Sequence, residues 1–240
     1  FPIGHNEPCP TGRAVSAAPG NTLRICGTID QNVFEQVEGK VRKNAVDGLI
    51  FDSFGGEIES SIKLAQLVYD HEIDIYVNHL CWSACSQYIL FAAPRIYTRP
   101  DSLILMHDTQ ASSNVLTKKI GVRANNRKLE DMERNLYTLL GVNEEVLFEP
   151  TASMDIKCGI FENYMRTGAF RVVSRYDFAM PSTEDAQELF GNKLQGDWPS
   201  EKRVRQKLKS MKAQPPRVRY GFDNEASSVT PLEECSAGER

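Results

Sequence analysis

The sequence predicts an α/β fold with a mainly parallel sheet. Three apolar runs, at residues 23–29, 46–51 and 73–77, each precede a stretch in which apolar residues recur at helical spacing. Such β-α-β-α-β-α alternation is typical of a parallel sheet whose connecting helices cover both faces. Ligands of these folds bind at the carboxyl ends of strands, so we expect the functional residues in the turns that follow the apolar runs.

The N-terminal residues 1–21 are rich in Pro, Gly and Ala and have no periodicity, which indicates an extended arm that Cys9 could tie down. After the strand at 23–29, Asp30 is placed to cap the next helix. The apolar residues of that helix share one face: Val33, Phe34, Val37 and Val41.

Two strand–turn–helix units then follow one another. The run at 49–51 ends in Asp-Ser-Phe-Gly-Gly at 52–56, and helical spacing resumes from Ile58 to Tyr69. The run at 73–77 leads into a turn of small residues that holds Ser83, and residues 84–93 have the pattern of a buried helix. The first turn offers backbone N–H groups without a Cβ in the way, and the second offers a nucleophile at a helix start.

A histidine completes these parts. A predicted pair of strands, 95–98 and 103–106, ends at His107, which Asp108 follows. Histidine is the commonest general base because its pKa lies near neutrality. Backbone N–H groups that face a developing oxyanion stabilise it by about 3 kcal/mol each. Together these residues indicate acyl-transfer chemistry.

The order Ser-Phe-Gly-Gly at 53–56, Ser83 opening an Ala- and Leu-rich helix, and Met106-His107 resembles the Clp protease proteolytic-subunit (ClpP) family of the ClpP/crotonase superfamily. It is most similar to exported, ATPase-free bacterial relatives whose nucleophile turn reads Cys-x-Ser-Ala-Cys. The resemblance is good over residues 23–107, loose over 115–141 and weak in the C-terminal third. It implies a serine peptidase with Ser83 as nucleophile, His107 as base, and the N–H groups of Gly56 and Ala84 as the oxyanion hole.

The acid of the implied triad is the least certain position of the match. The resemblance points to Asp177, just before a short strand and helix. Asp155 is the alternative because its distance from Gly141 fits the family, and a site without a single partner acid also stays open.

Other assignments of the chemistry are open as well. Cys85 could be the nucleophile or, paired with Cys81, could brace the turn around Ser83. Lys118 or Lys119 could be the base, as in signal-peptide peptidases. Three departures from the family pattern are compatible with a narrowed or inactive site: Phe54 in place of a proline, and the larger side chains of Cys85 and Gln87.

The longest helical pattern covers residues 115–140 and ends at Gly141. By resemblance it is the long handle helix that mediates subunit contacts; packing on its own domain is the alternative. Further along, residues 170–180 indicate a strand, and Ser182 caps a helix at 183–190 that Gly191 ends.

Length and composition bound the remaining possibilities. The 240 residues suit one domain at 22–198, flanked by the arm at 1–21 and an extension at 199–240. Six cysteines are too dispersed for a paired-cysteine zinc site, so we expect no metal and no cofactor. An even cysteine count and a chain that begins at Phe1 favour an exported protein, periplasmic or secreted, with disulfides and a removed signal peptide.

Residues 199–220 contain eight Lys or Arg residues against one acidic residue, Glu201. A solvated helix face explains this charge, and association with an anionic surface through 202–219 is the alternative; no motif indicates nucleic-acid binding. We therefore expect a homo-oligomeric, ATP-independent peptidase acting on peptides or unfolded proteins. A catalytically silent scaffold and a crotonase-like acyl-thioester enzyme are the competing hypotheses.

Overall fold

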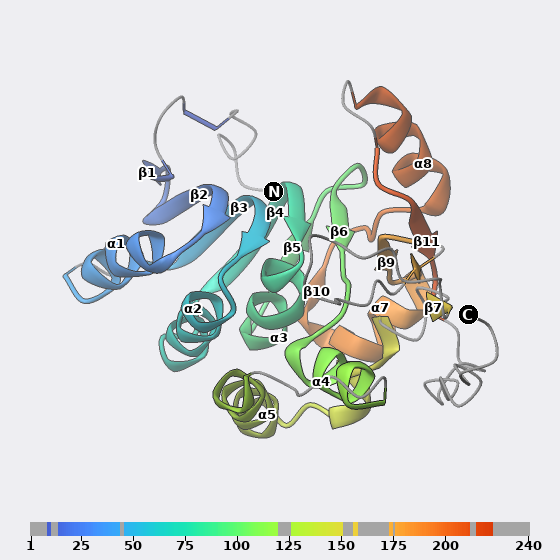
Figure 1. Ribbon diagram of the computed structural model, residues 1–240. Coiled ribbons are helices and arrows are strands. Elements are labelled where there is room, and N and C mark those ends of the chain that lie inside the picture. Colours follow the sequence, from blue (N-terminus) through green and yellow to red (C-terminus); the bar gives the residue numbers. More distant parts are fainter. Residues whose placement is uncertain are drawn as a thin grey trace, which may run out of the picture.

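A seven-stranded sheet forms the centre of the computed structural model, which describes residues 9–10, 14–43, 46–119, 126–150, 156–157, 173–174, 176–211 and 215–222. The strand order is β1-β2-β3-β4-β5-β10, and β6 pairs with β4 off this path. All of these pairings are parallel except that of β1 with β2. Figure 1 shows α1, α2 and α3 in a row beside the strands that they connect. The predicted mainly parallel α/β architecture is confirmed.

The first half of the chain follows the predicted alternation. Its elements are β1 (Val15–Ala18), β2 (Thr22–Ile29), α1 (Gln31–Val41), β3 (Gly48–Gly56), α2 (Ile58–Asp70) and β4 (Asp74–Trp82). Asp30 caps α1 as predicted, since its side chain accepts a hydrogen bond from the N–H of Val33. The apolar faces of both helices are buried against the sheet.

The strand β4 is longer than the predicted 73–77, and this length positions the site. Its first part pairs with β5 (Ile96–Thr98) and its last part, Leu80 to Trp82, pairs with β6 (Leu103–Leu105). The two short strands thus lie one after the other along β4. As a result, the end of β6 reaches the turn that follows Trp82.

The predicted buried helix at 84–93 is a π-helix, η1 (Cys85–Ile89), followed by the short α3 (Leu90–Ala92). The N–H of Leu90 bonds to the carbonyl of Cys85, five residues earlier. Single π turns of this kind occur frequently at functional sites.

The predicted single helix at 115–140 is two helices in the structure, α4 (Gln110–Lys119) and α5 (Arg127–Leu140). Asn126 has the non-helical angles φ −147° and ψ 64°, so α5 starts anew there. Gly141 ends α5 in the left-handed conformation, φ 65°, as predicted. Because α5 contacts α2 and α4 and buries Glu133, Leu136 and Tyr137, it packs on its own domain.

The C-terminal part adds two small sheets, β7 with β8 and β9 with β11. Its elements are η2 (Glu144–Leu147), β7 (Ile156–Lys157), β8 (Val173–Ser174), β9 (Phe178–Met180), α7 (Thr183–Phe190), η3 (Gly191–Lys193), β10 (Leu194–Gln195), α8 (Glu201–Ser210) and β11 (Val218–Tyr220). Ser182 and Asp185 form a capping box on α7, and Gly191 is its C-cap, as predicted. The predicted strand at 170–180 is not continuous, because the chain bends at Asp177 between β8 and β9. The strand β11 pairs in parallel with β9, so residues beyond 199 join the fold there.

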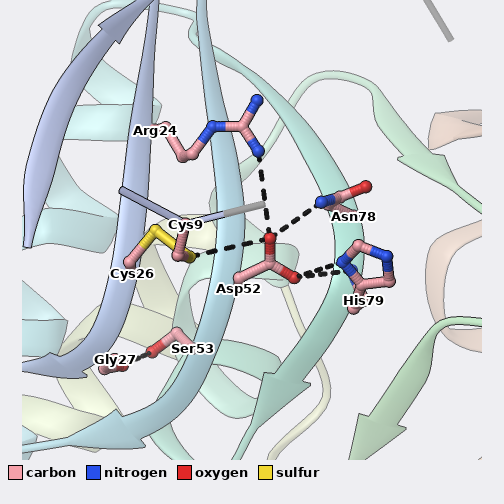
Figure 2. The surroundings of a disulfide bond; sticks show 8 residues. All are labelled: Cys9, Arg24, Cys26, Gly27, Asp52, Ser53, Asn78 and His79. Atoms are coloured by element: carbon pink, nitrogen blue, oxygen red, sulfur yellow. Dashed lines mark hydrogen bonds and ion pairs between the residues drawn. A yellow bond between two sulfur atoms is a disulfide. The ribbon is translucent and has the colours of Figure 1, made fainter. Parts of the chain in front are cut away.

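Two disulfides are formed, Cys9–Cys26 and Cys81–Cys85. The first ties the N-terminal arm to β2 beside Asp52 (Figure 2). Cys158 and Cys235 lie outside the described residues. Within the described ranges, no helix combines the length and apolar character of a bilayer span, and no three His, Cys, Asp or Glu side chains gather as a metal site would require.

Candidate active site

Ser83 occupies a strained turn between β4 and η1. Its φ of 54° lies in the left-handed region, which residues other than Gly, Asn and Asp adopt rarely and at a cost of about 1–3 kcal/mol. The turn is held from both sides: the N–H of Ser83 donates to the carbonyl of Leu105 over 2.7 Å, and Ser86 Oγ lies 2.9 Å from the carbonyl of Ser83. Strain that the surrounding structure sustains in this way is typical of functional positions.

The disulfide Cys81–Cys85 spans this turn. Both cysteines are fully buried, one at the end of β4 and the other at the first position of η1. The cross-link restricts the conformations of the three residues between them, including Ser83. The pairing that the sequence left open is present, so Cys85 has no free thiol to act as a nucleophile.

The Gly-Gly turn at the end of β3 packs against the same segment. A Cβ on Gly55 would lie 2.7 Å from Ser83 Cβ and 2.9 Å from the nitrogen of Ala84, and Gly55 has φ 87°. A side chain at this position would clash with the Ser83 turn, and the positive φ would strain any residue with a Cβ, so both features require glycine. A Cβ on Gly56 would instead lie 2.0 Å from the carbonyl oxygen of Ile29, so the second glycine is needed against β2. Gly56 and Ala84 stay predicted as the oxyanion donors.

A chain of hydrogen bonds starts at the serine hydroxyl. Ser83 Oγ lies 2.5 Å from His107 Nε2, and His107 Nδ1 lies 2.8 Å from Asp108 Oδ1. The hydroxyl of Ser113, in the first turns of α4, donates to the other oxygen of Asp108. When Nδ1–H donates a hydrogen bond to Asp108, Nε2 has no proton and can accept a hydrogen bond from the serine hydroxyl. This is the order of contacts in a serine nucleophile, base and orienting acid.

The electrostatics of the acid fit this order. Burial alone would raise the pKa of Asp108, but hydrogen bonds from His107 and Ser113 and the charge of His107 outweigh it, so the pKa lies below its usual value. Asp108 is therefore ionised near neutral pH and can hold the imidazole in the required tautomer. Its side chain is 42% exposed and that of His107 32%, so the pair is open to solvent on one side.

Asp177, the acid that the resemblance implied, does not contact His107. Both of its carboxylate oxygens bind Arg217, which lies 40 positions further along the chain; the contact from the guanidinium to Oδ1 is 2.7 Å long. The ion pair lowers the pKa of Asp177 and fixes its side chain at the junction of β9 and β11. The structure therefore does not bring the predicted acid Asp177 to His107, and the carboxylate in contact with His107 is that of Asp108.

Two alternatives from the sequence cannot be compared with this arrangement. Asp155 lies outside the described residues, and the side chains of Lys118 and Lys119 in α4 do as well. The ring nitrogen within hydrogen-bonding distance of Ser83 Oγ is His107 Nε2.

Aromatic side chains surround the serine and histidine. Phe54, before the Gly-Gly turn, is 52% exposed and lies edge-on to Trp82, with ring centroids 5.2 Å apart. Phe178 of β9 is 5.6 Å from the rings of both Trp82 and His107. Phe54 therefore places an exposed aromatic ring next to the turn that holds Ser83.

A buried carboxylate supports the site from behind. Glu133 of α5 accepts hydrogen bonds from the Tyr88 hydroxyl at 2.6 Å and from the N–H groups of Gln110 and Ala111 at 3.2 and 2.7 Å. It thereby caps α4 just after Asp108. Burial raises the pKa of Glu133, and these hydrogen bonds oppose the rise.

Sequence reasoning missed Asp108 and Ser113 as members of the site. The available signal was the His-Asp pair directly after an apolar strand, with a serine five positions beyond the acid. Alternation along a strand would send neighbouring side chains to opposite faces, but the chain leaves β6 at Leu105, so this rule does not apply at His107 and Asp108.

Comparison with known proteins leaves the family open. No family model and no curated protein matches the sequence. Among solved structures, a mutant of ClpP1 from Listeria monocytogenes is similar to 77% of this chain and 94% of its own, with 13% sequence identity and a TM-score of 0.44. This similarity is too low to transfer an activity.

Proposed function

We propose that this protein is a serine hydrolase that cleaves acyl bonds, with peptides as substrates, through a covalent acyl-enzyme. The observation that carries the proposal is the continuous contact from Ser83 Oγ through the His107 ring to Asp108, on a serine with φ 54°. A serine used only as a helix cap needs neither a histidine at 2.5 Å nor a left-handed backbone.

The reaction would use these residues in sequence. Ser83 Oγ attacks the carbonyl carbon while His107 Nε2 takes the hydroxyl proton, and the Asp108 carboxylate stabilises the imidazolium. The N–H groups of Gly56 and Ala84 are proposed to face the oxyanion. The tetrahedral species collapses as His107 gives its proton to the leaving amine. Water, deprotonated by His107, then releases the acyl group and restores Ser83.

Environment and partners extend the proposal. Two disulfides are compatible with an oxidising compartment, which supports the expected periplasmic or secreted location. Assembly into a homo-oligomer and contact of the basic residues at 202–219 with an anionic surface are likewise proposals. The helix α8 carries part of this charge on exposed positions, with Val204 buried beneath it.

Fluorophosphonate labelling tests the proposed function. We expect intact-mass and peptide analysis to find a single adduct on Ser83 that is absent in Ser83→Ala and His107→Ala. The Ser102→Ala variant is the matched control, because Ser102 is a buried serine whose hydroxyl donates to the carbonyl of Val77, away from Ser83 and His107. No adduct on folded wild-type protein would favour the silent scaffold. Binding of coenzyme A to that unlabelled protein would favour the thioester enzyme.

A further inference from the structure

Gln87 connects three parts of the candidate site. It lies in η1, is 2% exposed, and its backbone N–H donates to the carbonyl of Ser83 over 2.9 Å. Its side-chain Nε2 donates to the carbonyl of His107 over 2.7 Å. Its own carbonyl accepts a hydrogen bond from the Tyr137 hydroxyl of α5 at 2.5 Å. One residue thus contacts the nucleophile, the base and the helix behind them.

His107 needs such a partner because it lies beyond the sheet. After β6, the backbone N–H and carbonyl of Met106 still form hydrogen bonds with Ala179 of β9. His107 follows this last bridge to a neighbouring strand. The carbonyl of His107 comes after this bridge, and the Gln87 carboxamide satisfies it. Without that donor, the segment would still be attached to the nucleophile turn at Leu105, whose carbonyl accepts from the Ser83 N–H and from Ser86 Oγ, but His107 itself would lose its bond to η1.

We propose that Gln87 is the positioning residue that fixes His107 relative to Ser83. The inference rests on the proposed function, since it concerns the geometry of the same serine and base. A reacting pair at 2.5 Å is sensitive to small displacements, and a shift of about 1 Å at such a site can lower a rate by about 100-fold. Gln87, which departs from the small residues of the family pattern, thus takes part in the site and does not merely narrow it.

Substitutions at Gln87 separate positioning from general stability. Gln87→Leu keeps the approximate size and removes the donor. Gln87→Glu can donate to the carbonyl of His107 only when its carboxyl is protonated, and burial raises the pKa of a carboxyl. The titratable residues in contact with Gln87 are His107, through its backbone carbonyl, and Tyr137. The pKa of Tyr137 is raised well above its usual value by burial and by Glu133, so its hydroxyl stays protonated.

The matched control is Thr98→Val. Thr98 is a buried residue of β5 whose hydroxyl donates to the carbonyl of Asp197 over 2.8 Å. This variant also removes one side-chain donor from a backbone carbonyl, but away from Ser83 and His107. It reports what the loss of such a bond does to the melting temperature alone.

The experiment measures the rate of fluorophosphonate labelling of Ser83 from acidic to alkaline pH, together with the melting temperature. We expect Gln87→Leu to react at least about tenfold more slowly at every pH, while Thr98→Val keeps the wild-type rate. The rate of Gln87→Glu relative to wild type should fall as the pH rises through the pKa of the new carboxyl.

The failures are distinguishable. A wild-type rate in Gln87→Leu, or equal slowing of the Leu and Glu variants at all pH values, would overturn the positioning role and leave the hydrolase intact. Absence of labelling in wild-type protein would overturn the proposed function and this inference with it.

Discussion

Two aspartate–histidine pairs lie in the described part of the chain, and one of them contacts a serine hydroxyl. His107 Nδ1 is 2.8 Å from Asp108 Oδ1, and the other ring nitrogen is 2.5 Å from Ser83 Oγ. His79 Nδ1 is 3.1 Å from Asp52 Oδ1 on the neighbouring strands β4 and β3. Within the described part of the chain, no hydroxyl group hydrogen-bonds to His79.

The second pair is organised around its acid. Asp52 is buried and binds the backbone N–H of His79 at 2.8 Å, the Asn78 amide at 2.8 Å and the Arg24 guanidinium at 4.0 Å (Figure 2). A carboxylate taken out of water needs such partners, because burying an isolated charge is costly. The first pair is organised around its histidine, which has an acid on one side and a hydroxyl on the other. An Asp–His contact therefore indicates a base only when a nucleophile completes it.

Each pair also has a disulfide beside it, with a different task. Cys81–Cys85 joins residues four positions apart in the sequence, on either side of Ser83. Cys9–Cys26 crosses 17 positions and ties the arm to β2, with Cys9 Sγ 3.8 Å from Asp52. The first constrains a local conformation and the second closes a longer loop.

Replacing the two histidines should give the largest contrast. We expect His107→Ala to lower the labelling rate of Ser83 by about 10⁴-fold or more, because the hydroxyl loses its base. His79→Ala should keep the rate in folded protein. Equal loss in both variants would show that the difference between the pairs is not functional.

Replacing the two acids should separate activity from stability. Asp108→Asn should slow labelling by roughly 10³-fold, since the imidazole loses its orienting charge, with a small change in melting temperature. Asp52→Asn should lower the free energy of unfolding by about 2 kcal/mol, because one carboxylate oxygen becomes an NH2 group that faces the donor of Asn78 or of His79, and should leave the rate unchanged. Urea unfolding and labelling kinetics on both proteins check this, and slow labelling of stably folded Asp52→Asn would contradict it.

Removing each disulfide should sharpen the same distinction. The paired change Cys81→Ala and Cys85→Ala should slow labelling by about 10-fold or more, because Ser83 is freed from its constrained turn. By loop-closure entropy this bond contributes about 2 kcal/mol of stability, against about 3 kcal/mol for Cys9–Cys26. The paired change Cys9→Ala and Cys26→Ala should therefore cost more stability and no activity. The reverse ranking of rates would refute the bracing role.

The smallest expected effect is the pH dependence that Asp108 adds to stability. Its pKa in the folded protein lies below the ordinary value of 3.8, so its stabilisation is present above that pH and is lost as the pH falls through the folded value. The difference in unfolding free energy between wild type and Asp108→Asn should stay below about 1 kcal/mol at neutral pH, since solvent screens the half-exposed pair. It should vanish in acid, and a difference that grows toward low pH would contradict the assignment.

Much of the fold could be predicted because it depends on local patterns. The βα alternation, the Asp30 and Ser182 caps and the helix stops at Gly141 and Gly191 all follow from periodicity and terminal residues. The sequence pattern predicted one helix at 115–140 where the structure has two, and it did not predict the bend at Asp177. Apolar spacing continues across both places and does not reveal where the backbone leaves the regular conformation.

The sequence by itself indicated Ser83 and His107 as nucleophile and base, through the Clp-like order of motifs and because both follow predicted strands whose carboxyl ends lie at one edge of a parallel sheet. The structure brings the two side chains into contact. Only the tertiary structure decided which acid serves them. Arg217 forms an ion pair with Asp177 because β11 pairs with β9. This contact joins distant segments, and no local pattern encodes it. Asp108 reaches His107 because the strand ends at Leu105, where alternation of side chains stops.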